Sequence, residues 1–246
     1  ARMVLRGDMC VPMLQYDQVF APVVSFDTNR TLFAIAVEVM AEHPDTADVY
    51  QADVSMAFPN AELAEDVWAK IPVTQASEAP DGKPNVWKII KNVYGAPQGP
   101  KNWYDFFCKV MLGLPKRHEG VTVTRFTSDL CIFKVTKDGD TMWCSLYVDD
   151  ITTVSTHYRL REWFLDALRE HFTLQDAECG PCTWLLGVKV DVNYDKQTIS
   201  LSQALAIDKL VRSVGIKEAT ADLPMKPGLK LTRLTEHEKG INPKTC

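Results

Sequence analysis

The sequence lacks the features that mark several large classes of protein. No apolar run approaches the roughly 20 residues that a membrane-spanning helix needs. The chain carries no recognisable secretory signal, no internal repeat and no low-complexity tract. Its first residue is not Met, so we expect a piece of a longer polypeptide. With 246 residues, 46% of them hydrophobic and 24% charged, the chain has globular composition and enough length for a sizeable core.

Positive charge is also scarce. The chain has 27 Lys and Arg against 32 Asp and Glu, a formal net charge of -5, which argues against nucleic-acid binding through bulk charge. The distribution is uneven, because residues 201–246 hold eight Lys and Arg and five Asp and Glu. An acidic centre with a basic end suits a metal-dependent enzyme that holds a polyanion. An excess of three positive charges in this end is also small enough to arise by chance.

The seven cysteines do not indicate a disulfide framework. Their odd number and scattered positions favour reduced intracellular thiols. Cys179-Gly180-Pro181-Cys182 has the CGPC string of thioredoxin-type sites, whose mechanism needs the first Cys at the start of a helix. The following TWLLGVKVDV predicts a strand instead, and no second CxxC completes a zinc site. We favour coincidence, with a thiol oxidoreductase as the alternative if Cys179 begins a helix.

Apolar periodicity predicts a mixture of helices and antiparallel strands. Helical spacing is found in 28–43, after Pro100, in 157–172, and between a candidate N-cap at Ser202 and a terminating Gly215. Strand patterns cover 48–54, 86–94, two runs within 128–148 joined at Asp138-Gly139, and 151–155. The opening ARMVLRG is also strand-like, and 73–85 reads as a polar loop. Without regular alternation of strands and helices, the fold class is α+β.

Asp149 and Asp150 stand between two apolar, β-branched runs, where a tight hairpin should turn. Hairpin turns prefer Asn-Gly or Asp-Gly, so the pair is either an ordinary polar turn or a site where a divalent cation removes the repulsion. Asp53 ends an earlier strand, and it would join the pair if the two strands are neighbours. Three such carboxylates suit two Mg²⁺ ions. Spacing alone still favours a solvated turn.

The phrases around these acids carry a resemblance. QADVSMAF, YGAPQGPKNWY and LYVDD, in this order, resemble the reverse transcriptase of copia-like retrotransposons. Further phrases are similar to that family: ARMVLRG, YDQVFAPVV (16–24), SDLCIF (128–133), WLLGVKV (184–190), ISLSQ (199–203) and LPMKPGLKL (223–231). The resemblance implies a reverse transcriptase domain over 1–231 and a polar tail over 232–246. It implies a right-hand polymerase of fingers, palm and thumb, with a ferredoxin-like antiparallel palm sheet flanked by helices and a thumb from about residue 200.

The resemblance also assigns the metal site. Asp53 would be the first palm carboxylate, and Asp149 and Asp150 the pair on the palm hairpin. Asp53 and Asp149 would be the main bridging ligands of two Mg²⁺ ions, for which Mn²⁺ can substitute.

Other positions would surround the substrates. Phe58 matches the aromatic gate that excludes a 2′-hydroxyl, although a core aromatic is its ordinary alternative. Gln98 matches the glutamine that lines the deoxynucleotide pocket. Tyr147 and Val148 would lie beside the primer terminus and the nascent pair, although Tyr147 could equally pack on the sheet.

The two remaining assignments lie nearer the ends of the chain. Arg2 resembles the fingers arginine that contacts the triphosphate. Leu186 and Gly187 fall in the stretch that resembles the primer grip, where the backbone would position the primer. A turn is the ordinary alternative for Gly187.

The implied activity is RNA-directed DNA synthesis from deoxynucleoside triphosphates on an RNA template with a DNA primer. Integrase and RNase H regions are expected in the parent Pol polyprotein, which serves transposition and DNA integration, and no membrane partner is expected. The expected location is intracellular, in a cytoplasmic virus-like particle, and a nuclear phase is allowed. The alternative is a catalytically silent retroelement remnant that acts as a nucleic-acid-binding or structural module.

Overall fold

A computed structural model describes residues 4–13, 16–70, 85–215 and 228. The chain divides into two compact units, Ala1–Ser202 and Gln203–Cys246, which are described separately. Arg2, most of the predicted loop at 73–85 and the tail at 232–246 lie outside the described residues. Among the described helices, none combines the length and the apolar character needed to cross a membrane.

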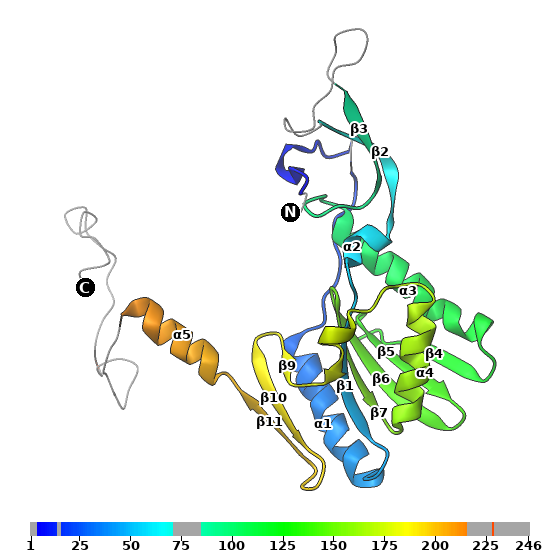
Figure 1. Cartoon of the computed structure of the whole chain (residues 1–246), viewed down its shortest axis with the longest axis vertical. Helices are drawn as coiled ribbons and strands as arrows, with labels where there is room; N and C mark the ends of the chain where they lie inside the picture. Colours follow the sequence, from blue (N-terminus) through cyan, green and yellow to red (C-terminus); the bar gives the residue numbers. More distant parts are fainter. Residues whose placement is uncertain (1–3, 14–15, 71–84, 216–227, 229–246) are drawn as a thin grey trace. The chain divides into compact units, whose positions relative to one another are not determined.

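The first unit is built on a six-stranded antiparallel sheet (Figure 1). The strand order is β4-β5-β6-β7-β1-β8. The strands are β1 (Asp48–Asp53), β4 (Val121–Arg125), β5 (Ile132–Lys137), β6 (Asp140–Tyr147), β7 (Asp150–Ser155) and β8 (Gly180–Pro181). The predicted hairpin at Asp138-Gly139 joins β5 to β6, and both turn residues have positive φ, 53° and 92°, as a tight hairpin requires.

Helices cover both faces of this sheet. On β1, Val49 belongs to a hydrophobic cluster with α1 (Phe26–Glu42), whereas Ala52 belongs to a larger cluster with α3 (Gly99–Arg117) and α4 (Tyr158–Arg169). Because side chains alternate along a strand, the two clusters lie on opposite faces. Gln51 and Asp53 share the face of Val49, the one that α1 covers.

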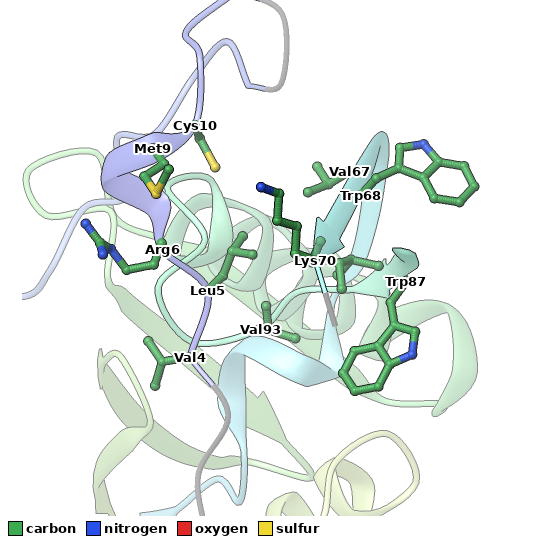
Figure 2. A pocket seen from close by; sticks show the side chains of 12 residues that line it. Val4, Leu5, Arg6, Met9, Cys10, Val67, Trp68, Lys70, Trp87 and Val93 are labelled. Carbon is green, nitrogen blue, oxygen red and sulfur yellow. The ribbon is translucent and has the colours of Figure 1, made fainter. Parts of the chain in front are cut away.

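Two smaller sheets complete the unit. The first pairs β2 (Glu62–Lys70) with β3 (Val86–Lys91), and a half-open, largely apolar cavity of about 380 Å³ lies between this hairpin and the N-terminal segment (Figure 2). The second small sheet consists of β9 (Trp184–Leu185), β10 (Val188–Asn193) and β11 (Thr198–Ser202), in the strand order β11-β10-β9. Three short helical segments are η1 (Gly7–Met9), α2 (Ala57–Asn60) and η3 (Asp176–Glu178).

The described part of the second unit is the helix α5 (Ala204–Val214). Gly215 ends it with φ 73°, and its N–H bonds the helix carbonyls, as predicted. Ser202 was wrong as the N-cap: Gln203 takes that position, because Ser202 is still paired in β11.

Other local predictions need correction. Residues 4–10 of the opening segment contain the 3-10 turn η1 and no strand. TWLLGVKVDV is two strands, because Leu186 and Gly187 both have positive φ and turn the chain between β9 and β10. The strands β2, β4 and β8 were not predicted; the last has only two residues and owes its place to pairing with β1.

The CGPC segment does not have the geometry of a thiol-redox site. Cys179 precedes the strand β8, not a helix. Cys179 packs against the larger hydrophobic cluster, whereas Cys182 is buried in the cluster under α1. Burial raises the pKa of Cys182 to about 12, so this thiol stays protonated and unreactive. The thiol oxidoreductase alternative is therefore wrong.

Candidate active site

Strand pairing brings the three acidic residues together. β1 and β7 are antiparallel neighbours, and their register places Asp53 opposite Asp150. Asp149 lies in the turn between β6 and β7, next to that pair. Carboxylate oxygens of Asp53, Asp149 and Asp150 lie within 4.8 Å of one another, close enough for one cation to contact all three. The turn itself is Val148-Asp149, so Asp150 is the first residue of β7 instead of a turn residue.

The acidic turn is held by two hydrogen bonds from outside the hairpin. Val148 has φ 56°, a conformation that strains a β-branched residue. Trp103 Nε1 of α3 donates to the Val148 carbonyl at 2.6 Å, and the Val54 N–H donates to the Asp149 carbonyl at 3.0 Å. Trp103 is fully buried against Phe107 and Phe172. The core therefore fixes the backbone that presents Asp149.

The acids repel one another in the absence of a cation. The pKa of Asp53 is raised to about 6 by loss of hydration first, and then by the charges of Asp149, Glu178 and Asp150. The pKa of Asp150 is raised for the same reasons, with Asp149 and Glu178 the contributing charges. Hard carboxylate oxygens that repel one another are the donors that Mg²⁺ and Mn²⁺ bind. The donor set thus fits a divalent metal.

Glu178 is a residue that the sequence reasoning missed. It lies in η3 and lines a small hollow of about 40 Å³ together with Asp53 and Asp150. Backbone hydrogen bonds from Ser55 N to Thr173 O and from Gln175 N to Asp53 O bring this segment beside the end of β1. No local pattern indicated it, because the approach results from tertiary pairing between segments about 120 residues apart.

The predicted nucleotide-site residues lie in and near the acidic turn, because Val148 belongs to the turn and Tyr147 precedes it. Phe58 and Val148 line one hollow of about 250 Å³. Gln98 is buried at the start of α3. The next residue, Gly99, lies beside Phe58, because a β-carbon built on Gly99 would be 3.9 Å from the Phe58 ring. Tyr147 is half-buried and packs against the larger hydrophobic cluster.

The predicted primer-grip residues form the β9–β10 turn. Leu186 has φ 49° and Gly187 has φ 80°. Leu186 packs against the cluster under α1, so its backbone, more than its side chain, is available to a ligand. The preceding strand β9 contributes Trp184 and Leu185 to the hollow that Asp53 and Asp150 line. Arg2, the remaining candidate, lies outside the described residues.

Known proteins resemble this chain along almost all of its length. The Retrovirus-related Pol polyprotein from transposon TNT 1-94 of Nicotiana tabacum is 28% identical over 246 residues, 98% of this chain and 17% of the relative. The Pol polyprotein from transposon RE1 of Arabidopsis thaliana is 28% identical over 243 residues, 96% of this chain and 15% of the relative. That of transposon RE2 from the same plant is 26% identical over 233 residues, with 94% and 15% covered.

The chain thus spans about a sixth of the length of these curated relatives. Residues 1–227 match the family described as Reverse transcriptase (RNA-dependent DNA polymerase). The family resemblance of the ordered motifs is confirmed. This chain belongs to the reverse transcriptase (RNA-dependent DNA polymerase) family.

Proposed function

We propose that this chain is the catalytic part of a copia-like RNA-directed DNA polymerase. It would extend a DNA primer on an RNA template with deoxynucleoside triphosphates. The observation that supports this most strongly is the convergence of Asp53, Asp149 and Asp150 at one end of the central sheet, with oxygens within 4.8 Å of one another. Family membership supplies the reaction class, and the carboxylates supply the group that such a reaction needs.

In this proposal Asp53, Asp149 and Asp150 hold two Mg²⁺ ions, with Mn²⁺ as a substitute. Such ions would supply positive charge that favours ionisation of the primer 3′-hydroxyl and offsets the charge of the triphosphate. The 3′-oxygen attacks the α-phosphate, and pyrophosphate leaves. The chain's own contribution is to hold the carboxylates and the reacting ends in position, which the Trp103–Val148 hydrogen bond supports at the acidic turn.

The remaining residues bind the substrates in this proposal. Phe58 excludes a 2′-hydroxyl, and Gln98, Tyr147 and Val148 border the deoxynucleotide and the nascent pair. Support comes from the hollow that Phe58 and Val148 share beside the acidic turn. The backbone at Leu186-Gly187 positions the primer, and Arg2 contacts the triphosphate.

The wider arrangement is also part of the proposal. Fingers, palm and thumb describe the domain over 1–231. The parent polyprotein holds integrase and RNase H regions and acts in a cytoplasmic virus-like particle with a nuclear phase. The names of the relatives as Pol polyproteins support the presence of further regions.

Primer extension on an RNA template with Mg²⁺ tests the activity. We expect the unaltered chain to extend the primer and Asp149→Asn to lose at least about a thousandfold, as expected when a preorganised charge-stabilising group is removed. Asp195→Asn is a matched control, because the same substitution falls on an exposed residue between β10 and β11. Synthesis by none of the three folded proteins would favour a catalytically silent remnant or a fragment that lacks essential parts. Equal synthesis by Asp149→Asn would refute the assignment of the site.

A further inference from the structure

The cavity between the N-terminal segment and the β2–β3 hairpin has the size of a small-molecule site (Figure 2). Its volume of about 380 Å³ exceeds the 250 Å³ of the hollow beside Phe58, and sites for small organic ligands span about 300–1,000 Å³. Of the described residues that the proposed function uses, none lines this cavity. The cavity is therefore separate from the acidic site and from the nucleotide hollow.

One wall of the cavity is an apolar face of the hairpin. Val67 lies opposite Ile89, and Ala69 lies opposite Trp87, so the members of each pair leave the same face as neighbours. The two pairs share one face, because they are two residues apart along each strand. All four residues line the cavity. A ligand on this wall therefore needs an apolar body.

The opposite wall is fixed to the backbone that follows β3. The Leu5 N–H donates to the Tyr94 carbonyl at 2.7 Å. Gly95 approaches the same segment closely, because a β-carbon built on it would lie 2.1 Å from the Leu5 carbonyl oxygen. Leu5 and Met9 line the cavity on this side, and Val93 lines it between the two walls. The space is thus bounded by the hairpin and by a segment that is hydrogen-bonded in place.

The charges around the cavity have one sign. Among the described residues that line it, Arg6 and Lys70 are cations and none is a carboxylate. Arg6 is paired with Asp8 at 2.6 Å and points away from the hairpin in Figure 2. Lys70 ends β2, and its side chain extends toward the N-terminal segment (Figure 2). It makes no ion pair or cation–π contact within the described ranges, so its charge is available to an anion from outside the chain.

From this arrangement we propose that the cavity binds a small amphipathic anion, with its apolar body against the hairpin face and its one acidic group on Lys70. Burial of the apolar body supplies most of the affinity, and the acidic group fixes the orientation. Arg6 and Lys70 repel a cation. A polyanion would leave most of its charge against apolar side chains, which is costly. The charge and the lining therefore select one ligand class.

Two probes with the same body test the charge contact. Anilinonaphthalene sulfonate is an apolar monoanion, and N-phenylnaphthylamine has the same rings without the charge. In fluorescence titrations, Lys70→Gln should weaken the sulfonate roughly threefold to fivefold and change the uncharged probe by less than about twofold. Lys88→Gln is the matched control, because Lys88 is on the same hairpin, pairs with Asp66 and does not line the cavity. Equal losses of both probes in Lys70→Gln, or the same loss of the sulfonate in Lys88→Gln, would overturn the inference.

A filled cavity tests the place of binding. Ala69→Phe puts a ring into the space from β2, so it should remove one binding site per chain for both probes. Ala34→Phe makes the same change on the exposed face of α1 and should remove none. Thermal unfolding shows whether each variant is folded. Full binding of both probes by folded Ala69→Phe would overturn the inference.

Hydrogen exchange gives the same answer on the unaltered chain. A saturating amount of the sulfonate should slow exchange of the Leu5 amide by at least about threefold, because the ligand lies against Leu5 and Val93 and stabilises the closed state. The Tyr158 amide, which bonds the Thr46 carbonyl away from the cavity, should keep its rate. Unchanged exchange at Leu5 would overturn the inference.

Sedimentation tests a second copy of the chain as the occupant instead. We expect Ala69→Phe to leave the state of association of the chain unchanged. A chain that binds neither probe, is dimeric and becomes monomeric in Ala69→Phe would assign the cavity to a second copy and overturn the inference. None of these measurements depends on primer extension, so this inference and the proposed function can fail separately.

Discussion

Replacement of Asp53 by Asn should stabilise the metal-free protein at neutral pH, and the effect should vanish in acid. The pKa of Asp53 is raised from 3.8 to about 6 in the folded chain, so the native state binds this proton more tightly than the unfolded state does. The ionised carboxylate therefore disfavours folding. This penalty is absent below about pH 4, grows as the pH rises toward 6, and is complete above it.

The size of the effect follows from the shift and from the exposure of the group. A shift of about two pKa units corresponds to about 3 kcal/mol. Because Asp53 is only half-buried, solvent screening reduces this to about 1 kcal/mol. For a unit of this size, about 1 kcal/mol raises Tm by about 2–4 °C. Mg²⁺ at ten times its Kd stabilises the unaltered chain by about 1.4 kcal/mol, which should reverse the order of the two proteins.

The difference in Tm between Asp53→Asn and the unaltered chain can be measured by thermal unfolding in a chelator between pH 4 and 7.5, repeated with Mg²⁺. The Asn variant should melt higher at pH 7 in the chelator, at the same temperature near pH 4, and lower with saturating Mg²⁺. Asp195→Asn should show none of these differences, because its side chain is exposed in a turn. An Asp53→Asn protein that melts at or below the unaltered chain at pH 7 without metal would refute the electrostatic reasoning.

Three further predictions concern the acidic turn, the N-terminal segment and the buried thiol of Cys182. Trp103→Phe removes the hydrogen bond to the Val148 carbonyl. It should lower the free energy of unfolding by about 1–3 kcal/mol and should also reduce primer extension. A loss of stability with full activity would contradict the role of this bond in holding the turn. Gly95→Ala places a β-carbon 2.1 Å from the Leu5 carbonyl oxygen, at a residue with φ +88°. The clash should increase hydrogen exchange at the Leu5 amide, which donates a hydrogen bond to the Tyr94 carbonyl. Unchanged protection of this amide would refute the close approach. Oxidised glutathione should leave Cys182 a free thiol in the folded protein, as measured by mass spectrometry after alkylation, and a disulfide from Cys179 to Cys182 would contradict the separation of the two clusters.

The local patterns predicted most of the elements that carry the site. Asp53 ends its strand as expected, and the β5–β6 hairpin turns at Asp138-Gly139. These signals are local, because hydrophobic alternation and turn chemistry act within a few residues. The adjacency of β1 and β7 was a conditional expectation, since no pattern in either strand specifies its neighbour. Only the register shows Asp53 opposite Asp150.

The parts that could not be predicted depend on contacts between distant segments. Glu178 reaches the acids because residues 173–175 pair with the end of β1, and its own neighbours in sequence give no sign of this. Trp184 reads locally as one more strand residue, and its position follows from the Gln51 side chain. The division of TWLLGVKVDV at Leu186-Gly187 was missed because a positive φ at Leu is rare.

We propose that Asp53, Asp149 and Asp150 hold the metal for RNA-directed DNA synthesis. Single-turnover addition of one deoxynucleotide to a DNA primer on an RNA template, measured across a Mg²⁺ titration, tests it most directly. The rate for the unaltered chain should saturate with Mg²⁺, and the rate for Asp195→Asn should be close to it. Asp149→Asn should lose at least about a thousandfold at every Mg²⁺ concentration. Addition by Asp149→Asn at the unaltered rate, or addition that persists in a chelator, would contradict the proposal.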